Sequence, residues 1–126
     1  MADWILLNGK KREWVKSLRN TVQSNRTTAE QYEPRTYAGD IYSNALDLAQ
    51  SAEKLYNEAK FSEAEELFGK AAKSFEQAKN SAFNSKLKFL TGEAEKAEQS
   101  AKWNELKSWA EKIRPMNNSL ADQFKT

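Results

Sequence analysis

Residues 52–64 read AEKLYNEAKFSEA, and residues 94–106 read AEKAEQSAKWNEL. The two segments start 42 residues apart, and six of their 13 positions are identical. Both contain an aromatic residue, Phe61 or Trp103, followed directly by a helix-capping residue. Self-similarity at a fixed spacing is typical of repeated supersecondary units. The sequence therefore predicts two similar units, each made of a helix, a tight turn and a second helix.

The composition of the whole chain points to an all-α domain. Its 126 residues include no cysteine and no histidine, and 20 basic against 18 acidic residues give a formal net charge of +2. These absences exclude disulfides, thiolate nucleophiles, cysteine-based zinc sites and the usual proton shuttle at neutral pH. Ala, Glu, Lys and Leu, all strong helix formers, dominate after Asp40. We expect an all-α protein that is not an enzyme and uses no cofactor or metal.

Apolar residues recur at helical spacing in five segments. The predicted helices cover residues 10–23, 40–60, 62–82, 83–100 and 104–114. They divide the chain into a basic N-terminal helix with a polar connector (1–39), a helical domain (40–115) and a polar C-terminal tail (116–126).

Particular side chains are expected to cap the starts of these helices and to fill the core between them. Asp40 is a good N-cap for the second helix. Ser62 and Glu65 have the spacing of a capping box at the start of the third. Five aromatic residues at helical spacing are predicted to be core: Phe61, Phe68, Phe75, Trp103 and Trp109.

The repeated units resemble the tetratricopeptide-repeat (TPR) superfamily over about residues 44–115. The matching positions are Ala52, Leu55, Ala59, Phe61, Ala64, Phe68 and Ala71, and then Ala94, Ala101, Trp103, Leu106, Ala110 and Ile113. Residues 45–78 are also similar to the MIT domain, a three-helix bundle with TPR-like packing. Either resemblance implies a right-handed bundle of antiparallel helical hairpins, preceded here by one N-terminal helix. Both imply binding of peptides or partner helices without catalysis.

The TPR resemblance also implies a partner-binding groove. Its predicted lining is Ala49, Glu53, Tyr56, Asn57, Lys88, Thr91, Glu95 and Glu98. Because its three glutamates outnumber its one lysine, a basic or amide-rich partner segment fits it better than a carboxylate. The alternative interpretation is an ordinary solvated helix face, since charged outer faces are the norm for amphipathic helices.

A basic cluster near the N-terminus supports a different function. It consists of Lys10, Lys11, Arg12, Lys16 and Arg19. These cations could contact the phosphates of a nucleic acid, or they could simply be solvated. The apolar stretch Trp4-Ile5-Leu6-Leu7 either docks on the core or anchors another chain. It is far shorter than the roughly 20 residues of a membrane span.

The main expectation is a cytoplasmic protein–protein interaction module that acts as an adaptor, chaperone or assembly subunit. One alternative is a small inhibitor that blocks a larger complex. Another is a nucleic-acid-associated subunit that contacts phosphate through its N-terminal helix. The residues do not name the partner or the oligomeric state.

Overall fold

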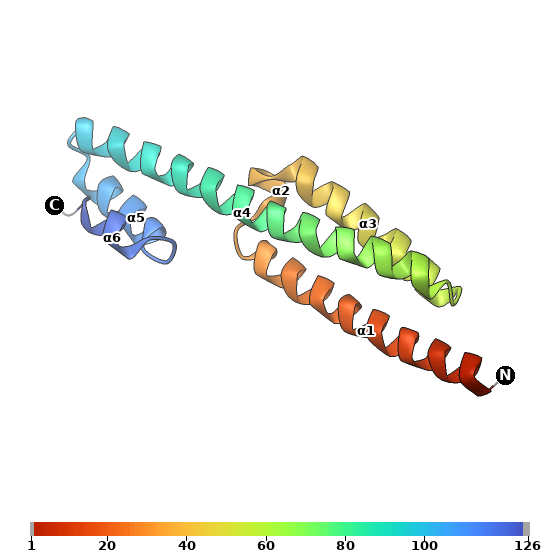
Figure 1. Ribbon diagram of the computed structural model, residues 1–126. Coiled ribbons are helices and arrows are strands. Elements are labelled where there is room, and N and C mark those ends of the chain that lie inside the picture. The colour runs from red at the N-terminus through yellow and green to blue at the C-terminus, as the bar shows by residue number, and fades with distance from the viewer. Residues whose placement is uncertain (1, 125–126) are drawn as a thin grey trace. The chain divides into compact units, whose positions relative to one another are not determined.

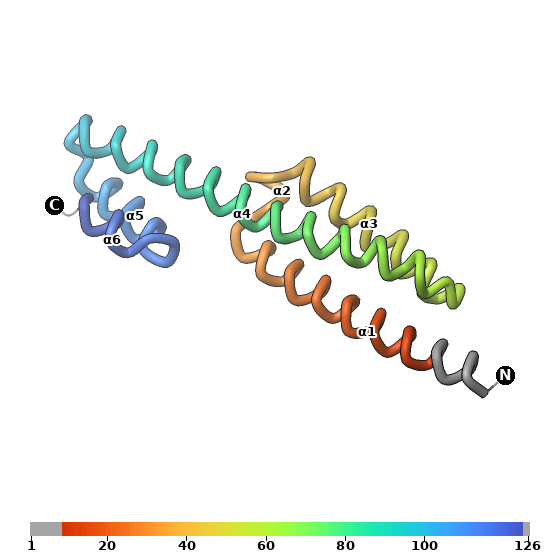
Figure 2. The backbone as a smooth tube through the Cα atoms, in the orientation of Figure 1, coloured from red at the N-terminus to blue at the C-terminus, as the bar shows by residue number. Residues whose placement is uncertain are grey.

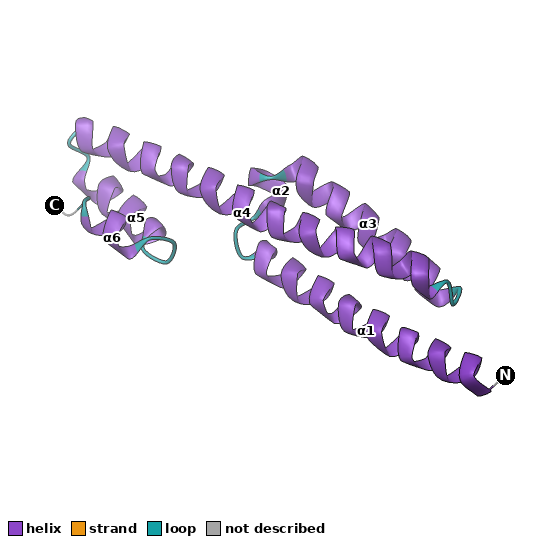
Figure 3. Ribbon diagram, in the orientation of Figure 1, coloured by secondary structure: helices purple, strands orange, loops and turns teal. Residues whose placement is uncertain are grey.

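The structure confirms the all-α class. The computed structural model describes the backbone of residues 2–124 and the side chains of residues 9–124, so the side chains of Trp4-Ile5-Leu6-Leu7 lie outside the described part. Within residues 2–124 the chain is helical with short turns and has no strand (Figures 1 and 3). The helices are α1 (Ala2–Glu30), α2 (Pro34–Tyr37), α3 (Gly39–Asn57), α4 (Phe61–Gln99), α5 (Trp103–Ile113) and α6 (Asn118–Asp122).

Helix α1 continues to Glu30, although the sequence predicts a polar connector from residue 24 onward. Tertiary contacts account for the difference. The side-chain amide of Asn25 donates a hydrogen bond to the backbone carbonyl of Ala72 at 3.1 Å, and Ala29 is completely buried. Such contacts outweigh the weak helix propensity of Asn, Ser and Thr. The connector therefore shrinks to the turn at residues 31–33.

The chain forms two compact units, Met1–Ala82 and Phe83–Thr126. In the first unit, α1 and α3 run alongside the first part of α4 (Figure 2). Its core contains Val15, Val22, Tyr42, Ala45, Ala52, Ala64, Phe68, Ala71, Phe75 and Ala78. The small alanines allow the helices to approach closely, and the rings of Tyr42 and Phe75 meet edge to face at 5.8 Å.

The second unit contains the last part of α4 together with α5 and α6. Its separate core contains Leu90, Ala94, Ala97, Leu106, Ala110, Ile113, Ala121 and Phe124. Asn117 caps α6, because its side-chain oxygen accepts a hydrogen bond from the backbone N–H of Leu120 at 3.0 Å. The C-terminal segment, predicted to be a polar tail, thus contributes two core residues. Compactness alone does not test which segments fold independently, so the predicted division at residues 39 and 115 stays a prediction.

Helix α4 is continuous where the sequence predicts two helices, 62–82 and 83–100. In the first unit its buried residues alternate in steps of four and three: Ala64, Phe68, Ala71, Phe75, Ala78 and Ala82. Continued in this alternation, the series would reach residues 85 and 89, but the second series is Leu87, Leu90, Ala94 and Ala97. The change in pattern is therefore a shift of the buried face by one to two residues. It needs no helix end, since no Gly or Pro lies nearby.

The two turns predicted from the repeat have the same backbone conformation. Ala59 and Ala101 both adopt left-handed geometry, with φ of 59° and 54°. The N–H of Lys60 bonds to the carbonyl of Leu55 at 2.9 Å, and the N–H of Lys102 bonds to that of Ala97 at the same distance. These are the bonds of a Schellman C-cap. The 42-residue repeat thus places Phe61 and Trp103 in equivalent positions, each as the first residue of a helix.

Replacing Ala59 or Ala101 with glycine should stabilise the protein. An L-residue in the left-handed region is strained, whereas glycine is not, so we expect a gain of about 0.5–1 kcal/mol for each change after the greater chain entropy of glycine is subtracted. Urea denaturation followed by circular dichroism measures this gain. The control is Ala72→Gly, a change within α4 that should cost about 1 kcal/mol. Destabilisation by all three changes would contradict the left-handed assignment.

Candidate functional site

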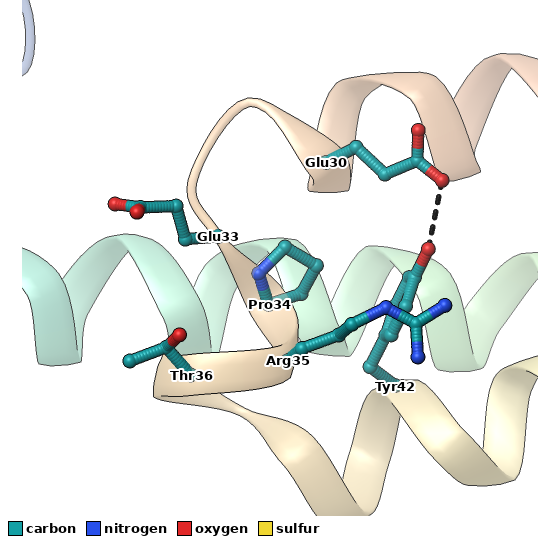
Figure 4. A pocket seen from close by; sticks show the side chains of 6 residues that line it. All are labelled: Glu30, Glu33, Pro34, Arg35, Thr36 and Tyr42. Atoms are coloured by element: carbon teal, nitrogen blue, oxygen red, sulfur yellow. Dashed lines mark hydrogen bonds between the residues drawn. The ribbon is translucent and has the colours of Figure 1, made fainter.

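A cavity of about 330 Å³ opens where the end of α1 meets α2 and the start of α3 (Figure 4). It is lined by Glu30, Glu33, Pro34, Arg35, Thr36 and Tyr42. Glu33 takes a left-handed conformation with φ of 53°, and Pro34 then begins α2, where a fixed φ suits the first helical turn. The turn carries the guanidinium of Arg35 over the ring of Tyr42, 5.2 Å from its centre.

Hydrogen bonds and burial shift the pKa values of two side chains of this cavity, Glu30 and Tyr42, away from neutral pH. The Tyr42 hydroxyl donates a hydrogen bond to Glu30 at 2.7 Å, and the Arg26 Nε donates another at 2.9 Å. These two bonds, that of Tyr42 first, lower the pKa of Glu30. Burial, followed by the bond to Glu30, raises the pKa of Tyr42. At neutral pH Glu30 is ionised and Tyr42 protonated, so neither is poised to exchange a proton. The arrangement favours a structural role, which is to fix the turn between α1 and α3.

Tyr42→Phe should destabilise the protein at pH 7 and reduce its sensitivity to acid. The lowered pKa of Glu30 contributes stability above the ordinary carboxyl pKa, and this contribution is lost as the pH falls through the lowered value. Without the Tyr42 hydroxyl, the pKa rises toward normal and the contribution shrinks. A hydrogen bond to a charged group is worth roughly 1.5–3 kcal/mol when buried, and we expect about 1 kcal/mol because half of the Glu30 side chain is exposed.

The measurement is the melting temperature of the wild type and the variant between pH 3 and pH 7. Glu30→Gln is the matched control, because it removes the ionisable group and should share the loss at pH 7. The difference between wild type and each variant should narrow as the pH falls. A difference that stays constant over this range would contradict the role given to the Tyr42–Glu30 bond.

In the first unit, most of the predicted groove residues are already in contact with other segments of the same chain. Arg19 of α1 donates a hydrogen bond to Glu53 at 2.5 Å, and its guanidinium lies 5.6 Å from the ring centre of Tyr56. Ala49 packs against the core, whereas Asn57 is exposed. The side of α3 that carries Glu53 and Tyr56 is thus in contact with α1.

The predicted groove residues of the second unit are more exposed. Lys88, Glu95 and Glu98 are exposed, and Thr91 is half-buried. The Thr91 hydroxyl is buried and has no hydrogen-bond partner in the described part of the chain. That these residues and those on α3 line one groove stays a prediction.

The predicted basic cluster does not form one free surface. Lys11 pairs with Glu65 on α4, and Arg19 pairs with Glu53 on α3, so two of the five cations stabilise the first unit. The other three are exposed: Lys10, Arg12 and Lys16. Periodicity alone could not identify these pairs, because each joins residues far apart in the sequence.

Glu65 has a different role from the predicted capping box with Ser62. Helix α4 begins at Phe61, and the Ala64 N–H bonds to the Lys60 carbonyl at 3.0 Å, so Ser62 already lies inside the helix. Glu65 instead accepts hydrogen bonds from Lys11 and from the indole N–H of Trp14. These bonds, that of Lys11 first, lower the pKa of Glu65. Asp40 likewise lies in the first turn of α3, and Ala38 is the cap residue.

Among the side chains of residues 9–124, three large hydrophobic ones are about half exposed: Trp14 at 52%, Phe89 at 48% and Trp103 at 53%. The prediction that Trp103 is a core residue is wrong. Phe61, its equivalent, packs edge to face against Tyr56 at 5.6 Å, but the second unit has Glu98 where the first has Tyr56. Of the other predicted core aromatics, Phe68 and Phe75 are buried, while Phe61 and Trp109 are half-buried.

In the second unit, Phe89 and Trp109 form an aromatic surface across α4 and α5. Their rings meet edge to face at 6.1 Å. The ammonium group of Lys112 lies 4.4 Å from the ring centre of Trp109, within the range of a cation–π contact. Phe89 was not among the predicted site residues, although it falls outside the apolar series Phe83, Leu87, Leu90, Ala94 and Ala97 of this segment.

Comparison with protein-family models, curated proteins and solved structures found no match to this chain. Within the described residues, no group of three or more acidic side chains is placed to hold a metal ion. In that same part of the chain, no helix has the length and apolar character needed to cross a membrane.

Proposed function

We propose that this chain is a non-catalytic protein–protein interaction module that binds a partner peptide or helix, as an adaptor, chaperone or assembly subunit does. The exposed aromatic residues of the second unit, Phe89 and Trp103, carry the proposal. Both expose about half of their surface although the second unit has a hydrophobic core of its own. Large aromatic side chains of this kind supply most of the binding energy in many protein interfaces.

The internal repeat supports a TPR-like or MIT-like origin for this module. Two turns with the same left-handed alanine and the same hydrogen bonds are what a duplicated helical hairpin would retain. The continuous α4 departs from a TPR array in one respect. The first hairpin consists of α3 and the first part of α4, and the second consists of the last part of α4 and α5, so the hairpins share a helix.

The two alternative functions, an inhibitor and a nucleic-acid-associated subunit, would use different surface residues. An inhibitor would use the same aromatic residues and differ only in what happens to the partner once it is bound. A nucleic acid would have to use Lys10, Arg12 and Lys16, because Lys11 and Arg19 already contact carboxylates. Binding to DNA or RNA with a steep dependence on salt concentration would support that alternative over the interaction module.

The test compares affinity capture from the native cell by the wild type, by a Phe89→Ala/Trp103→Ala variant and by a Ser85→Ala/Asn104→Ala control. The control changes exposed neighbours of the two aromatic residues. We expect quantitative mass spectrometry to find proteins that the wild type and the control retain and the aromatic variant loses. Identical sets for all three proteins would refute the proposal, provided that circular dichroism shows equal helicity.

A further inference from the structure

Trp103 lies at a corner whose equivalent in the first unit is covered by another helix. In the first unit the corner residue Phe61 packs against Tyr56, and Arg19 of α1 lies over the Tyr56 ring. Trp103 begins α5 directly after the equivalent turn, yet 53% of its surface is exposed. The first unit therefore shows what kind of side chain a hairpin of this repeat receives at its corner.

The residues around the two corners correspond through the 42-residue spacing. Glu53, which receives the Arg19 guanidinium at 2.5 Å, corresponds to Glu95. Tyr56 corresponds to Glu98, and both Glu95 and Glu98 are exposed one helical turn apart on α4. We call Glu95, Glu98 and Trp103 the Trp103 face. It keeps the carboxylate that receives Arg19 in the first unit, has a second carboxylate in place of the Tyr56 ring, and carries its aromatic ring at the position of Phe61.

The charge of the Trp103 face is not neutralised by its nearest basic neighbour along the helix. Lys96 lies between the two glutamates in the sequence, but its ammonium group contacts Glu93 at 3.2 Å. Two carboxylates beside an indole ring attract a guanidinium in particular, since arginine pairs with carboxylates and stacks on aromatic faces, and tryptophan is the strongest cation–π partner.

We propose that the Trp103 face binds an arginine-bearing, basic amphipathic helix of a partner protein, with Glu95 receiving an arginine as Glu53 receives Arg19 of α1. This inference rests on the proposed interaction function and gives the chemistry of the partner. An arginine of that helix lies against Trp103 and pairs with Glu95 and Glu98.

The experiment uses the full chain, labelled with ¹⁵N, and a synthetic peptide of residues 10–27 as the probe. This peptide carries the side chains that the first hairpin already receives, including Arg19. We expect the indole N–H signal of Trp103 to shift on titration, and an Arg19→Gln peptide to bind at least fivefold more weakly. A peptide that shifts the signals of Trp14 but not that of Trp103 exchanges with α1, and this result would overturn the inference.

A charge reversal in the full chain completes the test. Glu95→Lys/Glu98→Lys should weaken peptide binding at least tenfold. Glu63→Lys/Glu66→Lys is the matched control, because it also reverses two exposed glutamates three residues apart on α4, and it should change the affinity less than twofold. Equal weakening by both pairs would mean general charge attraction and would sink the assignment. If the lysine variant loses helicity, Glu95→Gln/Glu98→Gln replaces it, with an expected loss of at least threefold.

Failure of this inference can be told apart from failure of the proposed function. If the capture experiment finds partners that depend on the aromatic residues while the peptide leaves Trp103 unaffected, the interaction function stands. In that case only the proposal that the partner is an arginine-bearing helix is wrong.

Discussion

Replacing Phe75 with alanine should lower the free energy of unfolding by about 3–5 kcal/mol, which is the range for truncating a fully buried phenylalanine. Phe75 has no exposed surface and lies in the middle of the buried series of α4. Its ring also meets Tyr42 edge to face at 5.8 Å. The neighbouring core residues are mostly alanines, which cannot expand into the space that is left. The cost should therefore include most of the cavity as well as the lost burial.

Equilibrium denaturation in urea measures this loss. The matched control is Phe89→Ala, which removes the same group from the same helix at a position that is 48% exposed, and it should cost about 1 kcal/mol or less. Comparable losses for the two variants would mean that Phe75 is not the centre of the first core. The variants are best compared at one temperature, because the free energy of unfolding changes with temperature.

The repeat made the turns predictable, because it records local geometry. Ala59 and Ala101 recur together with the lysine and the aromatic residue that follow them, and the hydrogen bonds of the two turns are the same. Helical class follows from composition for a similar reason, since strong helix formers act residue by residue. Both are properties of short segments, which is the scale that a single sequence describes well.

Contacts between distant segments were not predictable in this way. Glu65 was expected to cap its own helix, but it bonds to Lys11 and Trp14, more than 50 residues earlier. Trp103 is exposed, and the equivalent of Tyr56, which packs against Phe61 in the first unit, is Glu98. The helical spacing of Trp103 is that of a core residue, and only the environment of the side chain shows otherwise.

The continuity of α4 is the point where the sequence pattern was most misleading. The buried face shifts by one to two residues after Ala82, and a shift of this kind resembles the end of one helix and the start of another. A helix can present two buried faces in succession if different elements cover them. Here α1 and α3 share the first core with α4, and α5 and α6 share the second.

Asn84→Pro tests this continuity and should cost about 3 kcal/mol or more. Proline at position 84 removes the N–H that a continuous helix bonds to the carbonyl of Asn80, and its ring clashes with that carbonyl. If one helix ended at residue 82 and another began at residue 83, proline would be tolerated there, since it suits the first turn of a helix. The side chain of Asn84 is exposed, so the backbone alone accounts for the effect.

Asn84→Ala is the control for this substitution, and it should be neutral or stabilise the protein by up to about 0.7 kcal/mol, because alanine is the better helix former. Circular dichroism at 222 nm during urea denaturation measures both variants against the wild type. A proline variant as stable as the alanine variant would show that the backbone is not helical at this point. A large loss with proline alone would mean that residues on both sides of Ala82 belong to one helix. The two hairpins of the repeat would then share α4, whereas two separate hairpins would need four helices.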